Sequence, residues 1–162
     1  MCEIGDRAGF LQKIREISGN YGVHLICFNA DMVVGKAHVE IAVNRAVRSF
    51  GSGNPISNSL EMEALLYAAG SRQTSVGSLF GLQSGENRLF VCCLPPNADV
   101  WEALCGLMVF CNRSDSWGCI DVKKQEDLMR LFHISGAELL TTHDRDLRKL
   151  VFERIALLDV NR

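Results

Sequence analysis

Short β-rich apolar runs that alternate with longer stretches of helical periodicity restrict the fold of this chain more than any other feature. GVHLICFN (residues 22–29) and NRLFVCCL (87–94) are apolar and are bounded by glycine, asparagine or proline, so each predicts a buried strand. The stretches around them repeat their apolar residues at helical spacing. About three or four strands mixed with about six helices predict an α/β or α+β fold, in which a small mixed or antiparallel sheet packs with several helices in two layers.

Four segments share the helical spacing: residues 9–18, 37–50, 98–111 and the C-terminal THDRDLRKLVFERIALLDV. We expect Gly19 to end the first helix and the GSGNP sequence to end the second. The third should turn Trp101 and Cys105 inward, together with Leu104 and Met108. In the last segment the acidic residues of DRD are typical of a helix N-terminus, and no further carboxylates gather beside them as a metal site requires.

The length of 162 residues predicts one domain, spanning residues 1–162. A net charge of -2 argues against non-specific duplex binding, which needs many phosphate contacts, but it permits a small basic pocket. The sequence contains no long uninterrupted apolar run, and its N-terminus does not resemble a secretory signal. We therefore expect a cytoplasmic protein that binds neither membranes nor DNA.

Seven cysteines without a CxxC pair predict reduced thiols that act as small buried hydrophobic residues, and they do not predict a zinc site. The GSGNPIS sequence lacks the lysine and the spacing of a phosphate-binding loop. No group of residues assembles a catalytic site, and no cofactor motif is present. We expect a protein that is not an enzyme, needs no metal or cofactor, and has a binding or scaffolding role.

The segment ISNSLEMEALLYAAGSRQ predicts a further helix, with Asn58 as its N-cap and Glu61 completing a capping box. Arg72 and Gln73 follow its C-terminus, where two interpretations apply. In the structural one, the Arg72 guanidinium satisfies carbonyls at the helix end and Gln73 is a solvated turn residue. In the functional one, the guanidinium binds phosphate or stacks on a base, while the carboxamide of Gln73 reads a base edge.

Two stretches, GKAHVEIAVNRAVRSF and ISNSLEMEALLYAAGSRQTSVGSLFGLQSGENRLFVCC, resemble the PRPK-binding protein family, and in particular its archaeal branch. This family is the small accessory subunit of the KEOPS complex. The shared features are a histidine-bearing helix (His38), the S-L-x-x-E motif that ends at Glu63, the Arg72-Gln73 pair, and a short helix that ends at Gly81. The C-terminal LRKLVFERIALLDV is also similar to the last helix of the family.

The resemblance implies a non-catalytic subunit that docks on the small lobe of an atypical protein kinase acting as an ATPase. The complex makes threonylcarbamoyladenosine in transfer RNA, and archaeal members of the family hold the single-stranded CCA end of that RNA. On this interpretation, the residues expected to contact RNA are Lys36, His38, Arg45, Arg72 and Gln73.

The docking surface for the kinase should be an apolar patch rimmed by charge. The candidates are two residues of the short helix and three of the final helix: Leu79, Phe80, Leu147, Val151 and Ile155. The alternative is that these side chains close the core, and the substitution Val151→Glu separates the two interpretations. A docking residue would lose the partner, whereas a core residue would unfold the protein.

Two other functions remain open from the sequence. One is a regulatory domain that binds a small anion between the GSGNP loop and Lys36. The other, more distant, is a thiol enzyme that uses Cys92 or Cys93, and it requires an unusually acidic thiol.

Overall fold

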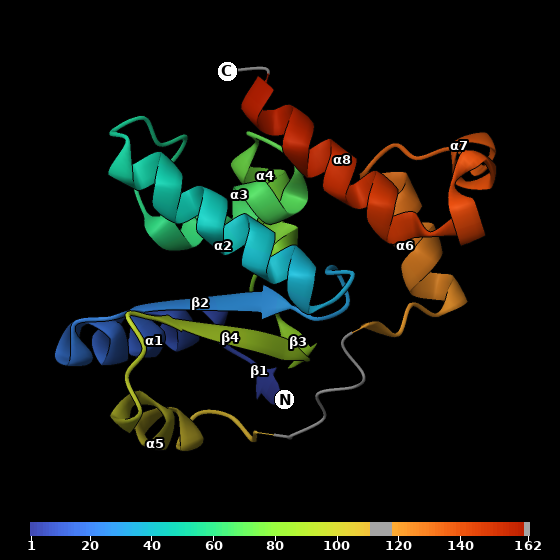
Figure 1. Cartoon of the computed structure of the whole chain (residues 1–162). Coiled ribbons are helices and arrows are strands. Elements are labelled where there is room, and N and C mark those ends of the chain that lie inside the picture. Colours follow the sequence, from blue (N-terminus) through green and yellow to red (C-terminus); the bar gives the residue numbers. More distant parts are fainter. Residues whose placement is uncertain (111–117, 161–162) are drawn as a thin grey trace.

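The computed structural model describes residues 1–110 and 118–160 (Figure 1). Its central element is an antiparallel ribbon formed by β2 (His24–Asn29) and β4 (Leu89–Leu94), whose register pairs His24 with Leu94 and Asn29 with Leu89. Both strands lie within the apolar runs that predicted them. The short strands β1 (Cys2–Ile4) and β3 (Gly85–Asn87) form a second antiparallel pair. The fold is therefore of the mixed α+β type, one of the two classes that the sequence predicts.

The pleat of the ribbon sends alternate side chains into different hydrophobic clusters. Ile26 and Phe28 join the largest cluster, whereas Leu25 and Cys27 pack into two smaller ones. The same alternation separates the adjacent cysteines, because Cys92 packs on the largest cluster and Cys93 on one of the smaller ones.

Helices cover both faces of the ribbon (Figure 1). On the face of Phe28 lie α2 (Lys36–Gly51), α3 (Leu60–Ala69) and α8 (Leu147–Val160). On the opposite face lie α1 (Arg7–Tyr21) and α5 (Asp99–Cys105). The remaining helical elements are α4 (Thr74–Gly77), η1 (Ser78–Phe80), α6 (Val122–Leu131), α7 (Gly136–Thr141) and η3 (His143–Arg145). No helix among the described residues is both long and apolar enough to cross a membrane.

Helix α1 continues through Gly19, where the sequence predicted its end. The chain leaves the helix at Gly22, which adopts the left-handed conformation with φ of 62°. There the Gly22 and Val23 amides donate to the carbonyls of Gly19 and Ser18. Glycine adopts this conformation without strain, so Gly22, and not Gly19, determines where the helix ends.

Helix α5 is shorter than the segment 98–111 that predicted it, and Cys111 lies outside the described residues. Beyond the helix, the Val109 amide donates to the Met1 carbonyl, and the Met1 amino group donates to the Val109 carbonyl. Trp101 and Cys105, expected inside, are exposed. The apolar periodicity overestimated the length of this helix, because it cannot detect a long-range hydrogen bond to the N-terminus.

The N-cap of α3 is Ser59, and the prediction of Asn58 was wrong by one position. The Ser59 hydroxyl accepts a hydrogen bond from the Met62 amide at 3.2 Å. Glu61 therefore has no capping role, and its carboxylate instead pairs with the His24 ring at 2.8 Å. At the start of α8 the prediction from DRD is confirmed, because the Asp146 carboxylate accepts from a backbone amide of the first turn.

Candidate nucleic-acid interface

The carbonyl groups at the C-terminus of α3 have hydrogen-bond partners other than Arg72. Gly70 is left-handed with φ of 58°, and the amides of Gly70 and Ser71 donate to the Tyr67 and Leu66 carbonyls. This is the Schellman arrangement of a helix end. A third carbonyl, that of Ala68, lies 2.9 Å from Nε2 of the His38 ring.

Arg72 and Gln73 are exposed, and their side chains form no hydrogen bond or ion pair with any described residue. The structural interpretation of Arg72 is therefore wrong, because backbone amides and a histidine occupy the positions where the guanidinium would have bound. Within the described part of the chain, the guanidinium of Arg72 and the carboxamide of Gln73 thus keep their hydrogen-bonding groups available to a ligand.

A cavity of about 960 Å³ opens beside these two residues. Its walls come from the α3–α4 junction, the end of α6 and the second half of α8, so segments distant in sequence meet there. Of the residues expected from the sequence to bind RNA or a partner, Arg72, Gln73 and Leu79 line it. The further polar and apolar lining includes Ser71, Val76, Asp127, Arg130, Phe132, His133, Arg154 and Leu157.

Gly70 allows the end of α3 to approach α8 closely. A Cβ atom at this position would meet a ring carbon of Phe132 at 3.4 Å and the carbonyl group of Arg154 at 3.5 Å. Its positive φ adds strain for any other residue. The same glycine therefore ends α3 and lets three elements form the wall of the cavity.

The cavity contains two guanidinium groups that sequence reasoning missed. Arg130 is largely exposed and lies 3.5 Å from Asp127 on the same helix. Arg154 is more restricted, because its guanidinium binds the Glu138 carboxylate at 2.6 Å and donates to the Phe132 carbonyl at 3.4 Å. Backbone hydrogen bonding by Ser135 and the contact with Arg154 lower the pKa of Glu138, which therefore stays ionised as the counter-charge of Arg154.

Arg130 and Arg154 escaped prediction because each belongs to the polar face of an amphipathic helix, where a cation is ordinary. Nothing in the spacing of two distant helices indicates that they meet at the end of a third. A basic residue in the last turn of α6 was the only local signal.

His38 does not lie on the surface, and its assignment as an RNA-contacting residue is corrected. Its side chain is fully buried, with Nδ1 accepting from the Val34 amide at 3.1 Å. This bond leaves the proton on Nε2, which donates to the Ala68 carbonyl. Burial lowers the pKa of His38 to about 4, so the ring is neutral and connects the start of α2 to the end of α3.

The other two basic candidates are not among the residues that line the cavity. Lys36 is exposed at the start of α2 and pairs with Glu40 at 3.4 Å. Arg45 is half-buried and lies nine residues further along α2. The structure thus brings together the pair at the helix junction and leaves the α2 cations apart from it.

A model of the family described as kinase binding protein CGI-121 matches residues 3–159. The chain belongs to this family. The kinase-binding family that the sequence resembles is thereby confirmed over nearly the whole chain. A search of curated proteins finds no match to the chain.

Four of the five residues proposed to dock the kinase belong to the core of this CGI-121 family member. These are Phe80, Leu147, Val151 and Ile155, each exposed by 4% or less. The apolar repeat of α8 faces inward because it packs on the largest hydrophobic cluster. Leu79 is the exception, with 41% of its surface exposed. Leu157, 42% exposed on the outer side of α8, lines the same cavity.

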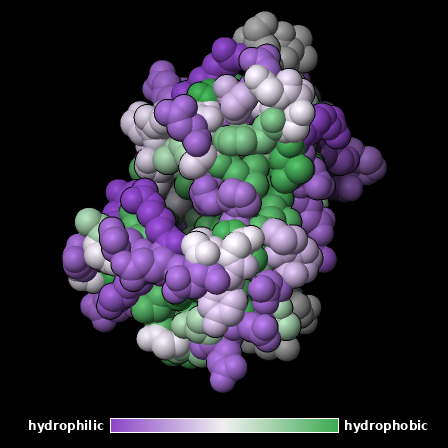
Figure 2. Space-filling model, turned by 90° about the vertical axis from the view of Figure 1, so that its left-hand side faces the viewer, coloured by the Kyte–Doolittle hydropathy of each residue, from purple (hydrophilic) through white to green (hydrophobic). Residues whose placement is uncertain are grey.

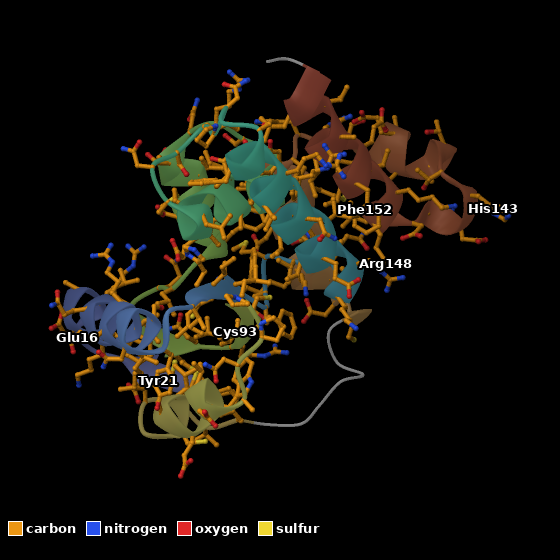
Figure 3. The ribbon with its side chains drawn as sticks, turned by 60° about the vertical axis from the view of Figure 1, so that its left-hand side comes forward. Glu16, Tyr21, Cys93, His143, Arg148 and Phe152 are labelled. Carbon is orange, nitrogen blue, oxygen red and sulfur yellow. The ribbon has the colours of Figure 1, made fainter. Side chains whose placement is uncertain are left out.

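The space-filling view of one side of the molecule shows a hydrophobic area framed by hydrophilic residues (Figure 2). The first half of α8 is fixed on the body of the protein, as Figure 3 shows for Arg148 and Phe152. The Phe152 ring lies 6.3 Å from the His38 ring, and the Arg148 guanidinium donates to the Gly118 carbonyl at 2.6 Å. Only the second half of α8 reaches the cavity.

The two rival functions find less support. An anion-binding regulatory domain would need free donors beside the GSGNP loop, but the Ile56 and Ser57 amides that follow this loop already donate to the internal carboxylate of Glu63. A thiol enzyme would need an acidic thiol, but burial raises the pKa of the Cys92 thiol to about 11. The neighbouring Cys93, labelled in Figure 3, contacts the Pro95 carbonyl at 3.3 Å.

Proposed function

We propose that this kinase-binding protein is the small accessory subunit of a KEOPS complex of archaeal type, which makes threonylcarbamoyladenosine in transfer RNA in the cytoplasm. In this proposal the protein catalyses no reaction. It binds the atypical kinase that acts as the ATPase of the complex, and it holds the 3′ CCA end of transfer RNA in the cavity beside Arg72. Membership of the family supports the kinase partner.

The observation that carries the RNA part of the proposal is the Arg72-Gln73 pair, which lines the cavity and whose side chains have no partner among the described residues. Single-stranded RNA ends are recognised by stacking on planar groups and by hydrogen bonds to base edges. Arg72 and Arg130 supply exposed guanidinium planes, Gln73 supplies a donor and an acceptor, and Leu79 and Leu157 supply apolar contact. The net charge of -2 is compatible with a site that contacts few phosphates.

The test is the affinity of the Arg72→Gln variant for two forms of one transfer RNA, with and without the CCA end. We expect Arg72→Gln to weaken binding of the complete RNA about tenfold, the loss typical of a charge-assisted contact, and to leave the trimmed RNA almost unaffected. Arg48→Gln is the matched control, because Arg48 is an exposed arginine of α2 that does not line the cavity. Equal losses for both RNAs, or for both variants, would refute recognition of the end by this site.

A further inference from the structure

A second cavity, of about 300 Å³, lies between α1, α3 and β2, apart from the one beside Arg72. One face of α1 forms its first wall. Five residues at helical spacing lie on this face: Arg7, Leu11, Ile14, Arg15 and Ser18. The first turns of α3 form the opposite wall. Figure 2 shows a side of the molecule that is hollowed between its upper and lower parts.

The interior of this cavity is apolar. Leu25 and Ile26 of β2 are buried in its floor, and Leu65 of α3 and Leu82 also line it. The Cys27 thiol lines it as well, and burial raises its pKa to about 12, so it remains neutral and hydrophobic in character.

Two arginines, Arg7 and Arg15, line this apolar space. The Nε atom of Arg7 is buried and has no hydrogen-bond partner among the described residues. Leaving a buried donor without a partner is unfavourable, so each one in a native structure needs a physical explanation, and a bound acceptor is one. Arg15 follows eight residues later on the same helix face, about 12 Å along the axis.

The charged residues that line the cavity are mostly basic. Glu61 is the one acidic residue among the described residues that line it. Its carboxylate is already paired with the His24 ring at 2.8 Å, and no described carboxylate pairs with Arg7. An anionic group placed against Arg7 would satisfy the buried donor and would meet no competing internal anion.

We propose that this cavity binds a small amphipathic monoanion, a carboxylate on a short apolar body, with the carboxylate on the Arg7 guanidinium and the body between α1 and α3. The volume is at the lower end of the range for ligand pockets, about 300–1,000 Å³, which suits a short chain or a single ring and excludes a peptide helix. The planar fork of arginine matches a carboxylate, and the leucine and isoleucine walls match the apolar body. This site is independent of the RNA site proposed above.

The test uses the full chain and octanoate, with octanol and octylammonium as neutral and cationic analogues of the same length. Binding is followed by backbone amide chemical shifts and by the melting temperature. We expect octanoate to shift the amides of residues 7–18, 25–27 and 59–65 saturably, and octylammonium to shift none of them. We expect Arg7→Gln to weaken octanoate about tenfold. Lys13→Gln, which removes the same charge from the exposed side of the same helix, should leave octanoate binding unchanged.

A second variant, Met62→Trp, tests the cavity itself, because it places an indole in the space from the α3 wall. We expect it to abolish octanoate binding while the circular dichroism spectrum stays that of the parent protein. The proposal is overturned if octanoate produces no saturable shifts, if octanol or octylammonium binds as well as octanoate, or if Arg7→Gln binds like the parent. Shifts confined to other parts of the protein, such as the exposed pair Trp101 and Phe110, would overturn it equally.

Discussion

His38 and Glu63 are buried polar residues on neighbouring helices, and each fixes a loop rather than a ligand. His38 joins the backbone before α2 to the end of α3. Glu63 accepts hydrogen bonds from the Ser49 hydroxyl at 2.8 Å and from the Ile56 and Ser57 amides. Both belong to the motifs by which the sequence resembles its family, so their role in those motifs is structural.

The buried neutral His38 makes stability depend on pH in a defined direction. Its pKa in the folded protein is about 4, lowered from 6.5, so the unfolded chain binds the proton more tightly. The contribution of neutral His38 to the free energy of unfolding is fully present above pH 6.5. As the pH falls from 6.5 to 4, this contribution is lost, and the free energy of unfolding decreases by about 3 kcal/mol in total. We expect His38→Gln to show a flatter fall of the unfolding free energy over this range, measured by urea denaturation. Parallel curves for the two proteins would contradict this assignment.

The carboxylate of Glu63 should be irreplaceable by an amide. In Glu63→Gln, the NH₂ group of the new side chain would face backbone N–H donors, so buried groups lose their acceptor. We expect a loss of about 2 kcal/mol or more in the free energy of unfolding, the range for hydrogen bonds to a charged group. Glu61→Gln, two residues earlier and in a partly exposed pair with His24, should cost less than about 1 kcal/mol. Equal losses would show that the carboxylate of Glu63 has no special role.

At the scale of elements, α8 has two sides with different roles. Leu147, Val151 and Ile155 face the core, while Arg154 and Leu157 face the cavity. The 3.6-residue period identified this helix from the sequence. It could not say which residues are buried, because an apolar stripe serves a core and an interface alike.

The two sides of α8 predict opposite results for the same substitution. Val151→Glu places a carboxylate in a fully buried position without a partner, so we expect the isolated protein to unfold. Leu157→Glu introduces the same charge at an exposed position, where the free energy of unfolding should change by about 0.5 kcal/mol or less. Thermal denaturation of the purified proteins distinguishes the two, and a folded Val151→Glu variant that only loses its kinase partner would restore the docking interpretation.

The ends of elements were predicted less well than their existence. Gly22 replaced Gly19 as the end of α1, and Ser59 replaced Asn58 as the cap of α3. Each error concerns a choice between two nearby residues that are both favourable at the end of a helix. That choice depends on backbone dihedral angles, which the packing of the helix on the sheet determines.

At the scale of the whole molecule, the distribution of charge matters more than its sum. The net charge is -2, but Arg72, Arg130 and Arg154 gather around one cavity, where Asp127 pairs with Arg130 and Glu138 pairs with Arg154. Such a site attracts a short anionic strand locally without the broad positive surface that a duplex requires.

This distribution predicts a weak dependence of RNA binding on salt. If about three phosphates are neutralised, the slope of log affinity against log salt concentration should be near -2 for a single strand. Titrations of complete transfer RNA at several salt concentrations measure it, and Arg72→Gln should make the slope less negative by about 0.7. A slope several times steeper would indicate duplex binding over a large basic surface and would contradict an end-specific site.

By itself the sequence determined that strands and helices mix in an α/β or α+β fold, and it determined the two central strands, the main helices and the resemblance to a kinase-binding family. Periodicity and turn residues encode the class, the strands and the helices locally, so no knowledge of distant contacts is needed for them. The resemblance rests on the order of the motifs from His38 to Gly81. It also drew attention to Arg72 and Gln73, which line the cavity.

Only the tertiary structure decided that His38, Phe80 and Val151 are interior, and that Arg130 and Arg154 join Arg72 around one cavity. The physical reason is that burial and juxtaposition depend on which helix faces meet. That depends on the packing of elements distant in sequence, here the approach of α3 to α8 that the absence of a side chain at Gly70 permits.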